Sequence, residues 1–324
     1  MDGPSRQLSR RAFVRGALLT SVAAAASAVR PIHETIARGQ TTDEVPRLDV
    51  HDPVVGVAAR PDGLLAVGGH AAAPRVWKLQ DDAGAWQVVA AEGAFPETTS
   101  LMDVAAHTSG FVAAGWTETA YGPRPSLLTS SDGAGWASAP LPEVGHGVGL
   151  AVATKDGGVV AAGATFDEPG VREPVRTVAF VSDIGGAWSE VPLDGVVVPR
   201  HGAVTMLTTA RDAFLLATTD VTGSALFAAT SPSGPWRAVA TPRSDQVVSF
   251  LAAADTSSGV LLAGIDALDR PRYWLEGARG WRETSAPAGL ATSSHVVGFA
   301  RTTDALVAAG SDAAGSFVEE VNAA

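Results

Sequence analysis

Short apolar runs recur along the chain from about residue 46, and each is followed by a polar turn and a second apolar run. MDVAAHTSGFVAAG (102–115) shows this pattern, and LAVATKDGGVVAAG (150–163) repeats it. Brief runs rich in Val, Ala, Leu and Phe, separated by Gly, Asp or Ser, are typical of β-strands. The other copies are VVGVAARPDGLLAVGG (54–69), VTMLTTARDAFLLAT (204–218), SFLAAADTSSGVLLAG (249–264) and VGFARTTDALVAAG (297–310). The pattern therefore predicts an all-β chain built from six copies of one unit.

Each of the first five units ends with a tryptophan behind a tight polar turn. These residues are Trp86, Trp136, Trp188, Trp236 and Trp281, at spacings of 45 to 52 residues. A period in this range indicates stacked supersecondary units, and four strands in about 46 residues is the size of one propeller blade. In the second unit the four expected strands are Met102–His107, Phe111–Trp116, Ser126–Ser130 and Trp136–Pro140. We therefore predict a six-bladed β-propeller with four-stranded antiparallel blades.

The two ends of the chain are predicted to share the last blade. The sixth unit has three apolar runs, Val296–Ala300, Ala305–Ala309 and Ser316–Val321, and no closing tryptophan. Arg47–Val50 precedes the first unit and occupies the place of a fourth strand. Because an open ring would expose unpaired strand edges, we expect Arg47–Val50 to pair with Ser316–Val321 and close the propeller.

The closing turns resemble Asp-box (BNR) repeats, the motif Ser-x-Asp-x-Gly-x-x-Trp of sialidase-like propellers. SSDGAGW (130–136) is a variant one residue shorter, SDIGGAW (182–188) and QDDAGAW (80–86) keep the Asp, a Gly and the Trp, and TSPSGPW and EGARGW lack the Asp. The Asp or Ser side chain would bond nearby backbone N–H groups, and Gly would supply a positive φ. The resemblance implies structural turns that lie away from an active face.

The N-terminus resembles a twin-arginine export signal, because Ser9, the pair Arg10-Arg11 and Phe13 stand in the expected places. The apolar stretch that follows has about 14 residues, which is short for a membrane span, and Ala26-Ser27-Ala28 matches a small-residue cleavage site. An ordinary secretory signal with a chance arginine pair is the alternative. We expect a signal peptide (1–28), a linker (29–45) and a propeller (46–324), exported through the twin-arginine (Tat) translocase to the periplasm or the extracellular space.

Charge and cysteine content exclude several classes of function. The net charge is −11, and residues 1–28 carry +3, so the chain without them carries −14. Such an acidic protein is a poor partner for nucleic acid or anionic membranes. The chain has no cysteine, which excludes disulfides, thiolate metal sites and a thiol nucleophile. We expect a monomer with no cofactor and no membrane insertion after signal cleavage, whose partner is a ligand, a glycan or a cell-envelope protein.

Two sets of polar residues are candidates for ligand binding. The first lies on a predicted long loop between the second and third strands of the second unit, and consists of Glu118, Tyr121 and Arg124. The second set aligns just ahead of the inner strands at the mouth of the channel: His51, Thr98, His146, His201, Asp245 and Ser293. Its three histidines and one aspartate could together hold a divalent metal. The alternative is that these are solvated loop residues, because opposite blades stand too far apart to share an ion. No bound metal is predicted.

The sequence predicts a binding module rather than an enzyme. Sialidase-like propellers use an arginine cluster, a Tyr–Glu pair and an Asp acid, whereas this chain has no Arg-Ile-Pro motif and only two tyrosines. Tyr121 shares its loop with Glu118 and Arg124, so a sialidase-like glycoside hydrolase or polysaccharide lyase with a divergent site is the alternative. A deep axial pocket would favour a small ligand, and a shallow surface across the rim would favour a protein partner.

Overall fold

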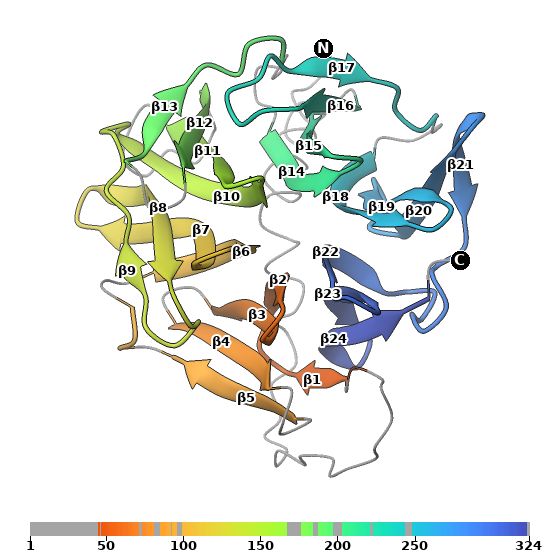
Figure 1. Cartoon of the computed structure of the whole chain (residues 1–324), viewed down its shortest axis with the longest axis horizontal. Coiled ribbons are helices and arrows are strands. Elements are labelled where there is room, and N and C mark those ends of the chain that lie inside the picture. Colours follow the sequence, from red (N-terminus) through yellow and green to blue (C-terminus); the bar gives the residue numbers. More distant parts are fainter. Residues whose placement is uncertain are drawn as a thin grey trace, which may run out of the picture.

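The computed structural model describes residues 45, 47–70, 73–80, 85–91, 93–95, 99–166, 176–183, 187–196, 203–220, 223–243 and 248–322. In this part of the chain, 24 strands form six four-stranded antiparallel sheets that stand as blades around a central axis (Figure 1). The predicted six-bladed β-propeller is therefore confirmed. No helix within the described ranges is long and apolar enough to cross a membrane. The predicted signal peptide and nearly all of the predicted linker lie outside the described residues.

The first three blades, from the inner to the outer strand, are as follows: β2 (Val54–Arg60), β3 (Gly63–His70), β4 (Ala73–Gln80) and β5 (Ala85–Ala90); β6 (Thr99–His107), β7 (Gly110–Thr119), β8 (Gly122–Ser130) and β9 (Ala137–Ser138); β10 (His146–Lys155), β11 (Gly158–Phe166), β12 (Arg176–Asp183) and β13 (Ser189–Val191). The other three are β14 (Ala203–Ala210), β15 (Ala213–Thr219), β16 (Ser224–Ala229) and β17 (Arg237–Val239); β18 (Val248–Thr256), β19 (Gly259–Asp266), β20 (Pro271–Gly277) and β21 (Gly280–Thr284); β22 (His295–Arg301), β23 (Leu306–Asp312), β24 (Gly315–Val321) and β1 (Leu48–Val50).

The two chain ends meet in the sixth blade, as the sequence predicts. β1 pairs antiparallel with β24, and Leu48 lies opposite Val318 (Figure 1). Just before β1, the Arg47 guanidinium contacts the carboxylates of Asp312, at 3.0 Å, and Glu319, at 2.5 Å. Backbone pairing and ion pairs therefore both fasten the first described residues to the last two strands, β23 and β24.

Each inner strand carries a β-bulge at the same place. The register against the second strand shifts by one residue between Val54 and Gly56 in the first blade, and between Leu101 and Asp103 in the second. The other four inner strands show the same shift. The residues that follow the bulge are therefore equivalent in all six blades: Gly56, Asp103, Ala151, Met206, Ala252 and Gly298.

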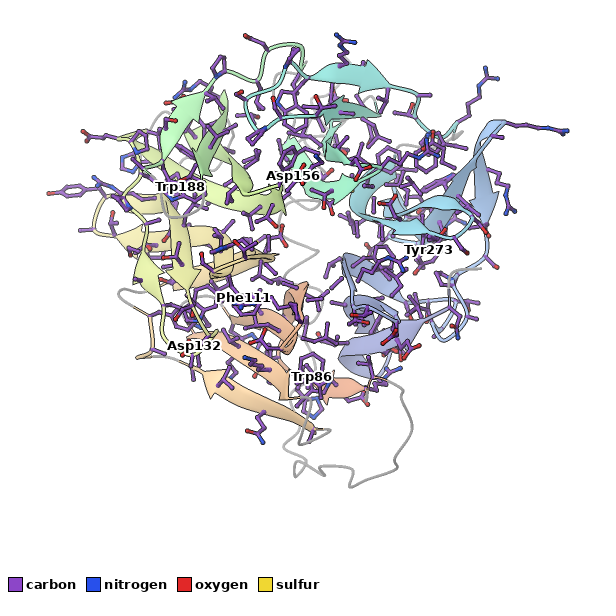
Figure 2. All side chains as sticks on the ribbon, in the orientation of Figure 1. Trp86, Phe111, Asp132, Asp156, Trp188 and Tyr273 are labelled. Atoms are coloured by element: carbon purple, nitrogen blue, oxygen red, sulfur yellow. The ribbon has the colours of Figure 1, made fainter. Side chains whose placement is uncertain are left out.

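The closing turn of the second blade has the bonding that its residues predict. The backbone N–H of Gly133 donates to Ser130 Oγ at 2.8 Å, and that of Ala134 donates to Asp132 Oδ1 at 2.8 Å. The N–H groups of Ala134 and Gly135 hold the pKa of Asp132 below its ordinary value. Figure 2 shows Asp132 in the outer part of the blade, away from the axis. This turn is a structural element of the blade.

The closing tryptophans are buried to different extents. Trp136 is 7% exposed and stacks on Phe95 with ring centroids 6.1 Å apart. Trp188 and Trp236 are also buried, whereas Trp86 and Trp281 are half-buried. Burial of the closing ring is therefore complete in the second, third and fourth blades.

Candidate functional site

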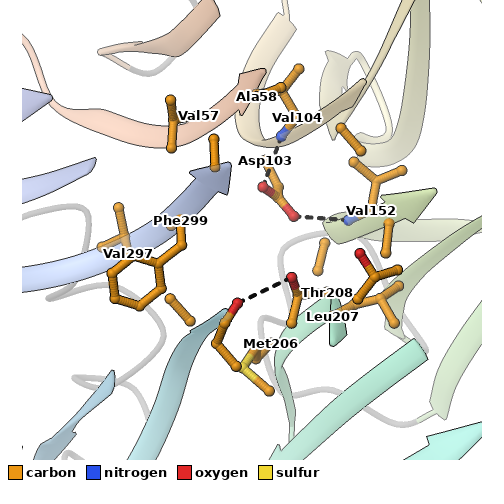
Figure 3. Close-up of a pocket in the computed structure, with 18 of the residues that line it drawn as sticks. Val57, Ala58, Asp103, Val104, Val152, Met206, Leu207, Thr208, Val297 and Phe299 are labelled. Atoms are coloured by element: carbon orange, nitrogen blue, oxygen red, sulfur yellow. Dashed lines mark hydrogen bonds between the residues drawn. The ribbon is translucent and has the colours of Figure 1, made fainter. Parts of the chain in front are cut away.

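The six inner strands surround an axial channel with a cavity of about 360 Å³ (Figure 3). Its walls come from β2, β6, β10, β14, β18 and β22, and most of the side chains are those of Val, Ala, Leu, Met and Phe. The threonines in the walls are Thr154, Thr205, Thr208 and Thr209. Among the described residues of the lining, Asp103 and Arg301 carry the only charges. Most of the lining side chains are therefore apolar, and backbone groups, threonine hydroxyls and these two charges supply the polar part of the surface.

The Asp103 carboxylate points into this channel and bridges two blades (Figure 3). Its Oδ1 accepts the N–H of Val104 at 2.8 Å on its own strand, and its Oδ2 accepts the N–H of Val152 at 2.9 Å on β10 of the next blade. Burial raises the pKa of Asp103 to about 7, against the opposing effect of these two N–H groups. The carboxylate therefore changes its protonation near neutral pH.

The bulge and a neighbouring glycine together make room for this side chain. Asp103 follows the bulge on β6, and Gly56 has the equivalent position on β2 of the preceding blade. A Cβ atom at Gly56 would lie 3.0 Å from both Asp103 Oδ1 and the Val104 nitrogen. Such a contact is tighter than a real Cβ tolerates without a shift, so glycine at position 56 leaves the carboxylate its place.

Asp103 is the channel residue that reasoning from the sequence missed. The run MDVAAH reads as an ordinary β-strand in which one acidic residue attracts no attention. A signal was present, because aligning the six units at their inner strands places Asp103 in a column whose other members are Gly, Ala, Met, Ala and Gly. One ionisable residue in an otherwise apolar column marks the position.

The predicted residues Glu118, Tyr121 and Arg124 lie at the exposed end of the β7–β8 hairpin. The long loop expected there is wrong: the strands continue in register through Thr119 and Gly122, and the Thr119 hydroxyl closes the turn by donating to the Gly122 carbonyl oxygen at 2.7 Å. Tyr121 is 68% exposed, and the Glu118 carboxylate accepts the indole N–H of Trp116 at 3.3 Å. The three predicted residues share the hairpin, and none of them lines the channel.

The residues predicted at the channel mouth are only partly described. His51 is exposed in the connection from β1 to β2, and Ser293 is exposed just before β22. His146 begins β10, and its buried Nδ1 has no hydrogen-bond partner among the described residues. Thr98, His201 and Asp245 lie outside the described residues. Within the described ranges, no three His, Asp or Glu side chains are grouped so that they could hold a metal ion.

Asp103 makes the stability of the fold depend on pH. Its folded pKa of about 7 lies above the ordinary value of 3.8. The stability that Asp103 contributes to the folded state is therefore fully present below pH 3.8 and is lost as the pH rises through 7. Between pH 5 and pH 8, the free energy of unfolding of the wild type should fall by about 2–3 kcal/mol relative to that of Asp103→Asn. Urea denaturation of both proteins at several pH values measures this difference, and a constant difference would contradict an Asp103 that titrates near neutral pH.

Comparisons with solved structures find this fold in proteins that differ in function. A proposed oxidoreductase (glucose dehydrogenase) from Thermus thermophilus has a TM-score of 0.56 at 14% identity, covering 86% of this chain and 98% of that chain. The PQQ-bound aldose sugar dehydrogenase from Streptomyces coelicolor has 0.54 at 13% identity, with 87% and 97% covered. A protein of unknown function from Bacteroides thetaiotaomicron has 0.54 at 12% identity, with 86% and 72% covered. No protein-family model and no curated protein matches the chain. At these identities, the similarities show the β-propeller fold alone.

Proposed function

We propose that this protein is an exported binding module that holds a small ligand in its axial channel. The observation that carries the proposal is the channel itself. Most of the side chains around its cavity of about 360 Å³ are apolar, and one carboxylate points inward. Sites for small molecules have volumes of about 300–1,000 Å³ and combine apolar walls with a few placed polar groups. A protein partner would instead favour a broad surface across the rim.

Binding fits the channel better than catalysis does. General acid–base chemistry uses titratable groups whose pKa values are set apart by their environments. Among the described lining residues, Asp103 is the one carboxylate, and the Arg301 guanidinium donates to the carbonyl oxygen of Asp255. The sialidase-like alternative lacks support, because the Glu118 carboxylate bonds to Trp116 and Tyr273 is buried with its hydroxyl bonded to the Ser294 carbonyl oxygen at 2.6 Å.

The rim and the export signal complete the proposal. Glu118, Tyr121 and Arg124 stay predicted contacts for a ligand that extends beyond the channel, and His51 and His146 stay predicted contacts near its mouth. His201 and Asp245 belong to the same prediction. The proposal of export rests on residues 9–13, which resemble a twin-arginine signal. An acidic propeller without cysteine agrees with folding before transport.

Filling the channel tests this function. Gly298 is the equivalent of Asp103 in the sixth blade, and a Cβ there would meet its nearest atom, the Val57 nitrogen, at an ordinary 3.5 Å. Gly298→Leu should therefore fold and occupy the cavity. We expect a fragment library to contain compounds that bind the wild type in calorimetry, and we expect their binding to be lost in Gly298→Leu.

Gly277→Leu is the matched control, because Gly277 ends β20 outside the channel lining and a Cβ added there would have no atom within 4 Å. It should bind the same compounds as the wild type. Two results would contradict the proposal: a wild type that binds no fragment, or fragments whose binding is unaffected by Gly298→Leu.

A further inference from the structure

We propose that the ligand of the channel is a small organic cation, an amine with an apolar body, whose ammonium group binds the Asp103 carboxylate. This inference rests on the proposed function and names the class of its ligand. It follows from three features of the channel: the unused acceptor capacity of Asp103, the absence of a compensating cation near it in the described residues, and the apolar walls around it.

The Asp103 carboxylate has room for another donor. An ionised carboxylate offers about four lone-pair sites, and the N–H groups of Val104 and Val152 occupy one site on each oxygen. Both of these donors are neutral backbone amides. Figure 3 shows the carboxylate pointing into the cavity, where a donor in the channel can reach its remaining sites. An ammonium group has three donors and no acceptor, and hydrogen bonds between such ionised partners are short and strong.

No cation near Asp103 compensates its charge within the described part of the chain. On the inner strands packed against β6, the basic residues are Arg60 at the end of β2 and His146 and Lys155 at the two ends of β10, each at least four residues along its strand from the level of Asp103. His107 ends β6 itself, four residues from Asp103. The outer strands β3 and β4 of the first blade also contact β6, and their basic residues pair with Asp52 or Asp62: His70, Arg75 and Lys78. Arg301 on β22 is three residues beyond the equivalent Gly298, about 10 Å along the axis.

The three cations at the C-terminal ends of β2, β10 and β22 each contact a partner at the same end of the channel. Arg60 contacts Asp62, Lys155 contacts Asp156, and Arg301 donates to the Asp255 carbonyl oxygen. A buried carboxylate without a counter-ion is costly. A cationic ligand would therefore gain the full benefit of pairing with Asp103.

The blades do not need a carboxylate at this level in order to pack. In the other five blades the equivalent residue is Gly, Ala or Met, and the ring closes without a polar side chain there: Gly56, Ala151, Met206, Ala252 and Gly298. Asp103 is thus a single departure from the repeat, and it lies where a ligand in the channel would touch it.

The walls around the carboxylate suit the apolar part of such a ligand. Val297, Phe299 and Met206 border the same cavity (Figure 3). Phe299 adds an aromatic ring, whose face attracts a nearby cation, and methionine adapts its shape to irregular contacts. A strongly hydrated inorganic ion would find one carboxylate here and otherwise only neutral oxygens such as threonine hydroxyls, whereas an organic ammonium group carries its own apolar surface.

The test compares phenethylamine with phenethyl alcohol, which has nearly the same shape and no charge. Isothermal titration calorimetry of the wild type at pH 8 should show the amine binding at least about tenfold more tightly, as one hydrogen bond between charged groups implies. In Asp103→Asn this preference should disappear. Asp156→Asn removes an exposed carboxylate on the rim and is the matched control, and it should keep the preference. n-Butylamine and cyclohexylamine, with the corresponding alcohols, extend the series to other body shapes.

The wild type alone supplies a second readout that does not depend on any variant folding. Because protons compete with the amine for Asp103, amine affinity should be about tenfold weaker at pH 6 than at pH 8, while alcohol affinity stays constant. Equal binding of amines and alcohols, or no binding of any amine in the series, would overturn the cationic ligand. With either of these results, the proposed function would still be upheld if fragments bind the wild type and do not bind Gly298→Leu.

Discussion

Removing residues 1–50 should lower the melting temperature of the propeller by about 10 °C or more relative to removing residues 1–44. The difference between the two proteins is the segment that contains β1, which pairs with β24. Leu48 is 6% exposed and packs in the same core cluster as Val54 and Val318. Losing a buried leucine costs about 2–5 kcal/mol, and the lost backbone pairing brings the total to about 5 kcal/mol.

The loss of Arg47 adds to this effect. Asp312 and Glu319 have side chains only 9% and 10% exposed, and both pair with the Arg47 guanidinium. Without it they would be two neighbouring, nearly buried carboxylates that have lost their arginine partner, and breaking a buried pair on one side is strongly destabilising. Differential scanning calorimetry of the two truncated proteins measures the shift. Equal melting temperatures would show that the ring does not depend on this closure.

Replacing Trp136 by alanine is expected to reduce the free energy of unfolding by roughly 3–5 kcal/mol. The Trp136 ring is buried, stacks on Phe95, and donates its indole N–H to the Gly133 carbonyl oxygen at 2.9 Å. It belongs to the cluster between the first and second blades that also contains Leu65 and Leu128. Its removal would leave a large cavity between two sheets, which the surrounding strands cannot fill without losing their pairing.

Trp281→Ala is the matched control, because Trp281 closes the fifth unit but is only half-buried on the outer strand β21. Its indole N–H donates to the Ala240 carbonyl oxygen at 2.7 Å. The loss for Trp281→Ala should be less than half of that for Trp136→Ala. Guanidinium denaturation followed by circular dichroism compares the two, and equal losses would mean that burial of the closing tryptophan does not govern its contribution.

Most of the fold could be predicted because its determinants are local. The predicted run Ser316–Val321 lies within β24, Gly315–Val321. Leu48–Val50, within the predicted Arg47–Val50, pairs where the missing fourth strand was expected. Alternation of apolar residues and Gly or Asp turns is visible in any one unit, and the period then counts the blades. The error fell on the β7–β8 hairpin, where polar residues such as Thr117 and Glu118 suggested a loop although they continue the ladder.

The candidate site was harder to predict, because its parts come from different blades. The hydrogen bond from Val152 to Asp103 joins residues 49 positions apart, and no local pattern indicates it. Burial raises the pKa of Asp103, and that burial exists only once six sheets enclose the channel. Reasoning from the sequence therefore favoured charged residues in expected loops, such as Glu118 and Arg124, over one acidic residue within a strand.

The sequence by itself determined the strands, the turns, the number of blades and the meeting of the two chain ends, since these follow from periodicity and from short-range turn chemistry. Only the tertiary structure decided which side chains share the axis. A bulge shifts the register of each inner strand by one residue. The ring then brings one equivalent position from every blade to the wall of the channel. Asp103 lies in the channel for that reason, and its chemistry comes from neighbours that are distant in the chain.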